Sequence, residues 1–135
     1  MDNLERITDV NITIVYMDLN KFKYINDTYG HDKGDEILCI FTNVLKGAFD
    51  KKGIVGRMGG DEFMIVFVNT SDEEVEKLCI QVKEQLIEES KKLSFDYTIS
   101  ASYGYATRPR GSNKLLDSVI VEADEKMYRY KEEDR

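Results

Sequence analysis

Three acidic residues stand beside apolar segments, at positions where acids could hold a metal ion. Asp18 directly follows the apolar run Ile14–Met17, while Asp61 and Glu62 lie between a Gly-Gly pair and the apolar run Phe63–Val68. If the first run is a strand that pairs beside a hairpin formed around the glycines, Asp18 and Asp61 approach each other. Carboxylates so placed form a hard-oxygen site suited to Mg²⁺ or Mn²⁺. Two such ions roughly 3.5–4 Å apart bridge a triphosphate and polarise an attacking oxygen.

Structural explanations exist for each of these residues taken alone. Gly-Gly-Asp is an ordinary turn sequence, and Asp18 would serve as the cap of a following helix. Together these explanations are weaker, because they leave Glu62 at the start of a strand without a structural task. Lys21 and Lys23 follow Asp18 at the start of a short predicted helix, where backbone N–H groups favour anions and Lys23 could contact a terminal phosphate. Taken without other evidence, an ordinary solvated lysine is the favoured explanation.

The elements that must position these residues follow from hydrophobic periodicity and turn signals. Gly59 and Gly60 favour a tight hairpin, since glycine accepts positive φ without steric cost. Ser71 with Glu74 three residues later is a capping-box signature. The predicted strands are 11–17, 54–58, 62–68 and 95–107, and the predicted helices are 19–29, 32–49, 71–92 and 114–131.

This order, β-α-α-β-β-α-β-α, predicts an α+β domain with a mixed sheet and helices on one or both faces, in a ferredoxin-like arrangement. Strand–helix–strand crossovers are expected to supply parallel pairings, and the hairpin an antiparallel one. The whole chain, residues 1–135, is predicted to be a single domain.

Composition limits the classes of partner. The chain has 135 residues, a formal charge of −7 and a sequence pI of about 4.8. Nucleic-acid binders normally present a basic face, so DNA, RNA and anionic membranes are not expected as main partners. No apolar run approaches the roughly 20 residues that span a bilayer. Cys39 and Cys79 both fall on apolar helix stripes and are predicted to be core residues in a reducing cytoplasm.

Four motifs in sequence order resemble those of the GGDEF domain family of diguanylate cyclases. The segment Met17–Glu36 resembles the family's D-x-D-x-F-K-x-I-N-D-x-x-G-H-x-x-G-D stretch, and Arg57–Phe63 is an intact R-x-G-G-D-E-F. Ser102–Ala106 is similar to the S-x-G-x-A strand, and Ala123–Lys131 to the A-D-x-A-L-Y-x-A-K helix. The resemblance runs from about residue 12 to the end, and implies a nucleotidyl-cyclase-like fold.

The resemblance also implies an activity, in which two molecules of GTP condense to cyclic di-GMP with release of pyrophosphate. Each domain would bind one GTP, so catalysis would need a second copy of the domain facing the first. Two Mg²⁺ or Mn²⁺ ions per active site would be held by Asp18, Asp61 and the Leu19 carbonyl. Glu62 would help to deprotonate the attacking 3′-hydroxyl, and Lys23 would act with Asp61 and Glu62 in catalysis.

The same resemblance places the substrate. Asn26 and Asp35 would read guanine, since a carboxylate accepts from N1–H and the 2-amino group, which adenine does not offer. An alternative for Asp35 is a first-turn acid favoured by the helix dipole. The β- and γ-phosphates would be bound by Lys23, Lys131 and Arg135, with Phe22 also at the substrate. Arg57 is expected to be structural or to position the site.

Three positions depart from the family pattern. Asn20 replaces the common second Asp, with little effect expected. The product-inhibition motif R-x-x-D is replaced at its ends by Asp50 and Gly53, so no inhibitory site is predicted. The D-x-L-T-G-L-x-N-R segment that usually precedes the first strand is absent, so residues 1–135 are interpreted as a GGDEF domain truncated at its N-terminus, with an attached sensor or regulatory domain in a longer cytoplasmic or membrane protein.

Other functions remain open on the sequence alone. The chain would serve as a weak or inactive GTP-binding regulatory module if turnover has been lost, or as an interaction scaffold, since fold does not fix function. A cyclase making a mixed purine dinucleotide is a further alternative, against which Asp35 argues.

Overall fold

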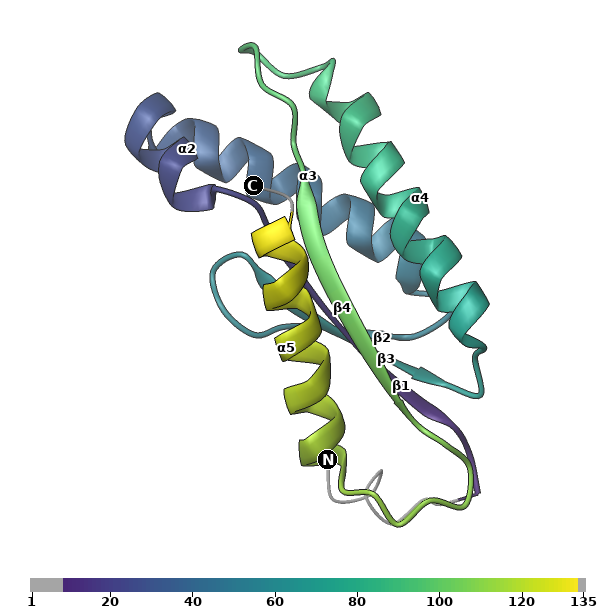
Figure 1. Cartoon of the computed structure of the whole chain (residues 1–135). Helices are drawn as coiled ribbons and strands as arrows, with labels where there is room; N and C mark the ends of the chain where they lie inside the picture. Colours follow the sequence, from purple (N-terminus) through teal and green to yellow (C-terminus); the bar gives the residue numbers. More distant parts are fainter. Residues whose placement is uncertain (1–8, 134–135) are drawn as a thin grey trace.

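The computed structural model describes residues 9–133, which form one four-stranded sheet with four helices (Figure 1). The strand order is β2-β3-β1-β4. The elements in chain order are β1 (Ile12–Leu19), α2 (Phe22–Tyr29), α3 (His31–Phe49), β2 (Ile54–Arg57), β3 (Glu62–Val68), α4 (Asp72–Ser90), β4 (Ala101–Arg108) and α5 (Leu116–Glu133).

All three strand pairings are antiparallel, which corrects the prediction of parallel pairs. The crossover from β1 through α2 and α3 does lead to a strand that runs in the direction of β1, but β3 lies between the two. The crossover from β3 through α4 likewise passes over β1 to reach β4. Each crossover therefore skips one strand, as in a split βαβ unit. The α+β class and the ferredoxin-like arrangement are confirmed.

Helices cover both faces of the sheet, and β1 is buried along its whole length. Alternate residues of β1 point to opposite faces, as the pleat requires. Val15, Met17 and Leu19 pack in the larger core beneath α3 and α4. Ile14 and Tyr16 pack in the smaller core beneath α5. A strand buried on both sides reads as a continuous apolar run, which explains why the sequence of β1 barely alternates.

Helix α5 lies close against β4 because of Gly104. A Cβ added at Gly104 would lie 2.2 Å from the backbone nitrogen of Met127 and 2.6 Å from the carbonyl oxygen of Ala123. Only glycine permits this approach. The contact sets the height of α5 over the sheet, and so sets where the C-terminal turn of the helix reaches.

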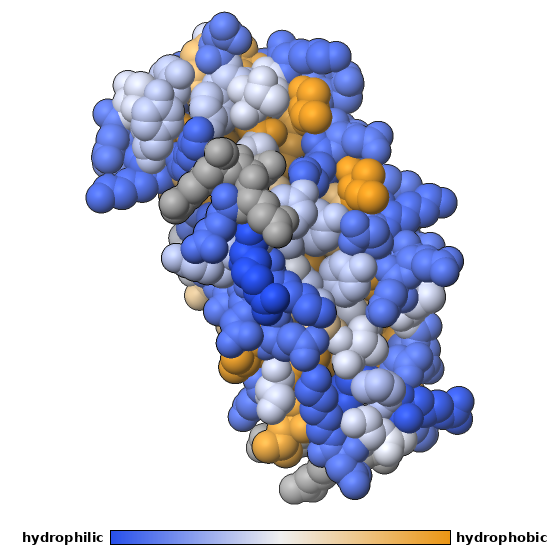
Figure 2. All heavy atoms as spheres, in the orientation of Figure 1, coloured by the Kyte–Doolittle hydropathy of each residue, from blue (hydrophilic) through white to orange (hydrophobic). Residues whose placement is uncertain are grey.

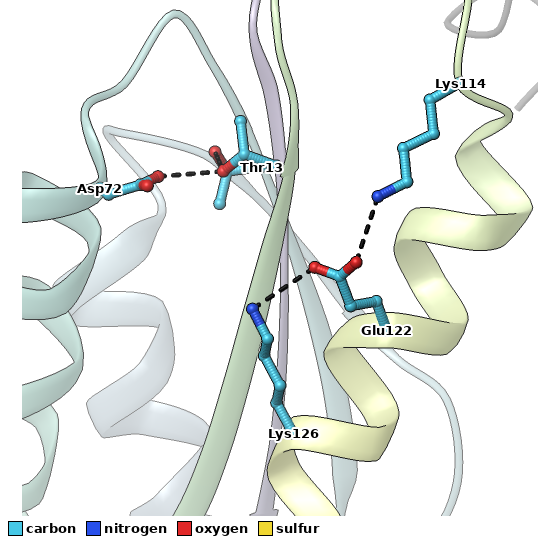
Figure 3. A network of polar contacts seen from close by, with 6 residues as sticks. Thr13, Asp72, Lys114, Glu122 and Lys126 are labelled. Carbon is cyan, nitrogen blue, oxygen red and sulfur yellow. Dashed lines mark hydrogen bonds and ion pairs between the residues drawn. The ribbon is translucent and has the colours of Figure 1, made fainter.

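Polar contacts tie α4 and α5 to neighbouring parts of the chain (Figure 3). On α5, the carboxylate of Glu122 accepts from Lys114 at 3.1 Å and pairs with Lys126 at 3.3 Å. These lysines lower the pKa of Glu122, the hydrogen bond from Lys114 most strongly. At the start of α4, Asp72 accepts from the Thr107 hydroxyl of β4 at 2.9 Å. Both helices are thereby held to the edge strand and its following loop.

Several element boundaries differ from the predicted ones. β4 begins at Ala101 rather than at residue 95, since Phe95 and Tyr97 pack with Tyr29 instead of pairing in the sheet. α2 begins at Phe22, because its N-cap Lys21 has a left-handed backbone with φ 59°. Cys79 is buried as predicted, whereas Cys39 is exposed.

Among residues 9–133, no helix combines the length and apolar character needed to cross a bilayer. The face in Figure 2 is mostly hydrophilic, and its apolar side chains form separate spots.

Candidate functional site

Asp18 lies at the end of the central strand, with its side chain on the α5 face of the sheet. It is opposite Glu62 of β3 and Ser102 of β4, so it is flanked by strands on both sides. The residue is 9% exposed. The alternative that Asp18 caps helix α2 is wrong, because the cap position is Lys21 and no side chain bonds to it.

The hairpin loop brings the other two acids to the same place. The amide N–H of Leu19 donates to the carbonyl oxygen of Asp61 at 3.3 Å, which joins the loop to the end of β1. Burial raises the pKa of Asp18, and the neighbouring Asp61 carboxyl raises it further. Glu62, the next residue, is the partner of Asp18 in the pairing of β1 with β3. Asp18, Asp61 and Glu62 therefore converge at one end of the sheet.

Lys131 supplies the positive charge of this cluster. Its ammonium donates to the Asp18 carboxylate at 2.8 Å and to the carbonyl oxygen of Leu19 at 3.2 Å. Lys131 belongs to the last turn of α5, and the close packing at Gly104 brings that turn over the end of β1. The ammonium thus contacts two of the oxygens that were predicted to bind a metal ion.

Burial dominates the electrostatics of the acids. It raises the pKa of Asp18 to about 7, although the hydrogen bond and charge of Lys131 oppose the rise. Burial also raises the pKa of Glu62, and the charges of Asp124 and Asp61 raise it further. Burial and mutual repulsion destabilise the charged forms of crowded carboxylates, so such groups tend to take up a proton or to bind a cation. The cluster is therefore short of positive charge.

A divalent ion fits this donor set, although the set is not a complete protein cage. Within residues 9–133, no group of three or more His, Cys, Asp or Glu side chains is arranged to hold a metal ion. Mg²⁺ is usually bound through one or two carboxylates, with substrate phosphates and waters completing its shell. The oxygens of Asp18 and Leu19 already bind a cation, the Lys131 ammonium, which marks their location as one that favours positive charge.

Arg57 is hydrogen-bonded to the glycine loop that precedes Asp61. Its guanidinium donates to the carbonyl oxygen of Gly59 at 3.1 Å and to that of Gly60 at 2.7 Å. Neither glycine has positive φ, so the predicted reason for their presence is wrong. A Cβ at Gly60 would meet nothing within 4 Å, and at Gly59 only the Glu62 Cβ at 3.9 Å. The fold itself does not require glycine at either position.

A second group of predicted site residues lies on α2 and α3. Phe22 packs against the larger core, while Lys23 and Asp35 are exposed. Asp32, not Asp35, is the acid in the first turn of α3, which weakens the helix-dipole explanation for Asp35. Asn26 places its Oδ1 atom in a buried position with no hydrogen-bond partner. Among the described residues, no hydrogen bond or ion pair connects this group to the acids; the predicted ligand Arg135 lies outside them.

Residues to which the sequence analysis gave no role at the site also support it. The Asn20 side chain accepts from the Ser102 hydroxyl at 2.7 Å and donates to that of Ser100 at 2.9 Å, which ties the end of β1 to β4. Asp124 of α5 adds negative charge near Glu62. Asp124 stands in the Ala123–Lys131 motif, and that motif was the available signal for its presence at the site.

Comparison with known proteins decides the family. A family model described as "Diguanylate cyclase, GGDEF domain" matches residues 2–135. The chain belongs to the GGDEF domain family. The curated relatives include diguanylate cyclases that are longer than this chain and match it over part of their length.

Among curated relatives, signaling protein YkoW of Bacillus subtilis is 31% identical over 98% of this chain and 17% of that protein. A diguanylate cyclase of Vibrio cholerae is 30% identical over 92% of this chain and 38% of that protein. The cyclic di-GMP phosphodiesterase PdeR of Escherichia coli is 32% identical over 90% and 18%. The chain thus spans less than half the length of each of these relatives.

Solved structures agree with the fold. The active GGEEF domain of a Vibrio cholerae diguanylate cyclase superimposes with a TM-score of 0.81, at 28% identity, over 91% of this chain and 78% of that one. The GGDEF domain of DgcB from Caulobacter crescentus, in complex with c-di-GMP, superimposes with a TM-score of 0.85 at 24% identity, over 99% and 83%.

Proposed function

We propose that this GGDEF domain is a diguanylate cyclase that condenses two molecules of GTP into cyclic di-GMP and releases pyrophosphate. The observation that carries the proposal is the convergence of Asp18, Asp61 and Glu62 beside the glycine loop, with a lysine ammonium on the oxygens of Asp18 and Leu19. Relatives named as cyclases and as a phosphodiesterase are similarly identical to the chain, so relationship alone does not decide the activity.

The acids are suited to phosphoryl transfer at a ribose hydroxyl. Bound Mg²⁺ or Mn²⁺, two per site, would neutralise the triphosphate and polarise the reacting oxygens, with Asp18, Asp61 and the Leu19 carbonyl holding them. Glu62 would accept the proton of the 3′-hydroxyl. Its raised pKa supports this role, because a general base works best when its pKa approaches the working pH.

The remaining residues would bind and orient GTP. Asn26 and Asp35 would contact the guanine, beside Phe22. Lys23, Lys131 and Arg135 would hold the β- and γ-phosphates, and Lys131 would have to leave Asp18 to do so. Arg57 would position the loop through its bonds to the two glycine carbonyls. Catalysis would consist mainly of positioning and charge neutralisation.

Two domains would have to meet for the reaction, because the 3′-oxygen of one GTP attacks the α-phosphate of the other. We propose a homodimer of the catalytic domain in the cytoplasm, controlled by a sensor or regulatory domain of the full-length protein. A GTP-binding module without turnover is the second candidate, favoured by the Lys131 ammonium, which occupies the Asp18 and Leu19 oxygens that would hold the metal ions.

An assay of cyclic di-GMP formation from GTP and Mg²⁺ or Mn²⁺, at several protein concentrations, tests the proposal. Specific activity should rise with protein concentration, since the site forms between two copies. Glu62→Gln should abolish turnover, while Glu84→Gln, an exposed acid on α4, should leave it unchanged. GTP binding without product, even when two copies are fused, would favour the binding module. Absence of GTP binding would refute both.

A further inference from the structure

A glycine inside helix α3 stands where glycine is unfavourable. Gly34 is buried in the second turn of the helix. Glycine within a helix destabilises it by about 0.5–1 kcal/mol relative to alanine, because it loses more conformational freedom on folding. Gly34 has no positive φ that would require glycine. Its presence therefore needs a reason outside the helix.

The reason lies in the neighbouring helix. A Cβ added at Gly34 would lie 1.8 Å from Oδ1 and 2.8 Å from Cγ of Asn26. The Asn26 amide thus occupies the volume that any side chain at position 34 would fill. Gly47, in the same helix, offers a contrast, since a Cβ there would meet nothing within 4 Å.

The amide seated on Gly34 is itself unusual. Its Oδ1 atom is buried and lacks a hydrogen-bond partner. Buried polar atoms without partners destabilise a fold, and each one in a structure calls for an explanation. No hydrogen bond of this atom among residues 9–133 explains its position. A requirement to hold the amide in one fixed orientation would account for both the glycine and the oxygen without a partner.

We infer that Gly34 is a positioning residue for nucleotide recognition, which holds the Asn26 amide in the orientation that contacts guanine by leaving room for it. This inference rests on the proposed function and adds to it a residue that does not touch the nucleotide. Replacement of Gly34 by alanine would drive the Asn26 side chain out of its seat. Because the clashing atoms belong to the end of a rotatable side chain, the fold would accommodate the change.

The test separates positioning from stability. Gly34→Ala is expected to retain or raise the melting temperature, because alanine favours the helix. It should weaken GTP binding, measured by calorimetry with Mg²⁺, by at least tenfold, and leave the weaker binding of ATP unchanged, so that the preference for guanine falls. Gly47→Ala should bind GTP as the wild type does. In ¹⁵N spectra without nucleotide, the Asn26 side-chain amide resonances should shift in Gly34→Ala only.

A double-mutant cycle identifies the route of the effect. In an Asn26→Ala background, Gly34→Ala should cause no further loss of GTP affinity, since the amide that it displaces is already absent. Equal GTP binding by Gly34→Ala and wild type, or an equal loss in both backgrounds, would overturn the inference while the proposed function stood. If Gly34→Ala unfolds the protein and the added Asn26→Ala substitution restores folding, Gly34 is only a packing residue, and the inference is also overturned. A wild-type protein that binds no GTP would instead refute the proposed function, and the inference with it.

Discussion

Replacement of Asp18 by asparagine should stabilise the metal-free protein at alkaline pH. The pKa of Asp18 is raised from 3.8 to about 7, mainly by burial. Between these values the folded protein holds a proton that the unfolded chain has released, so stability falls as the pH rises through this interval. Asparagine has no charge to bury, and its amide oxygen still accepts a hydrogen bond from Lys131.

The size of the effect follows from the two pKa values. One pH unit of differential proton binding corresponds to roughly 1.4 kcal/mol, so the full interval is worth at most about 4 kcal/mol. Part of this loss of stability in the wild type has already occurred by pH 5. Between pH 5 and pH 8.5, the stability of Asp18→Asn relative to wild type should therefore increase by about 2.5 kcal/mol.

Urea unfolding in EDTA at pH 5, 7 and 8.5 measures this difference. Asp50→Asn, at the exposed C-cap of α3, serves as the control and should show no comparable trend. Saturating Mg²⁺ at pH 8.5 should stabilise the wild type and not Asp18→Asn, because a ligand stabilises only the state that binds it. A difference between Asp18→Asn and wild type that stays constant from pH 5 to pH 8.5 would refute the reasoning.

Two further substitutions test the placement of α5. Without nucleotide at pH 8.5, Lys131→Met should bind Mn²⁺ several times more tightly than wild type, because the ammonium no longer competes for the oxygens of Asp18. The same variant should bind GTP less tightly. Calorimetric titrations that show unchanged Mn²⁺ affinity would contradict this. Gly104→Ala should lower the free energy of unfolding by about 3 kcal/mol, since its Cβ would collide with α5 backbone atoms at 2.2 and 2.6 Å. Gly56→Ala, whose Cβ would meet only the Met64 carbonyl oxygen at 3.8 Å, is the matched control in urea unfolding, and equal losses in both variants would show that α5 does not rest on Gly104.

The sequence predicted most elements, because local patterns determine them. The buried run of β1, the apolar stripe of α3 and the capping of α4 are all present, and the Ser71 hydroxyl accepts from the Glu74 amide at 3.1 Å as the capping signature requires. Strand order was not predictable in this way. It depends on which strand each crossover skips, and the expected parallel pairs were therefore wrong.

The candidate site shows the same division. The positions of Asp18 and Asp61 at strand ends were enough to predict their convergence. The contact of Lys131 with Asp18 joins residues 113 positions apart, and it depends on the height of α5 above Gly104. The contact of the Asn26 amide with Gly34 was equally unpredictable, because a contact between two helices leaves no periodic pattern in the sequence.

The two groups of proposed ligands belong to opposite sides of the sheet. Asp18 faces α5, whereas Asn26 sits on α2, beside Ile25, which packs in the core of the α3 and α4 side. A molecule gripped by both groups has to arch over the sheet rim at Leu19 and Asn20. Such a ligand would add a connection between two layers that are otherwise joined through the strands and through the contact of Lys83 on α4 with Tyr130 on α5, so that its base and its phosphates would be held by different layers.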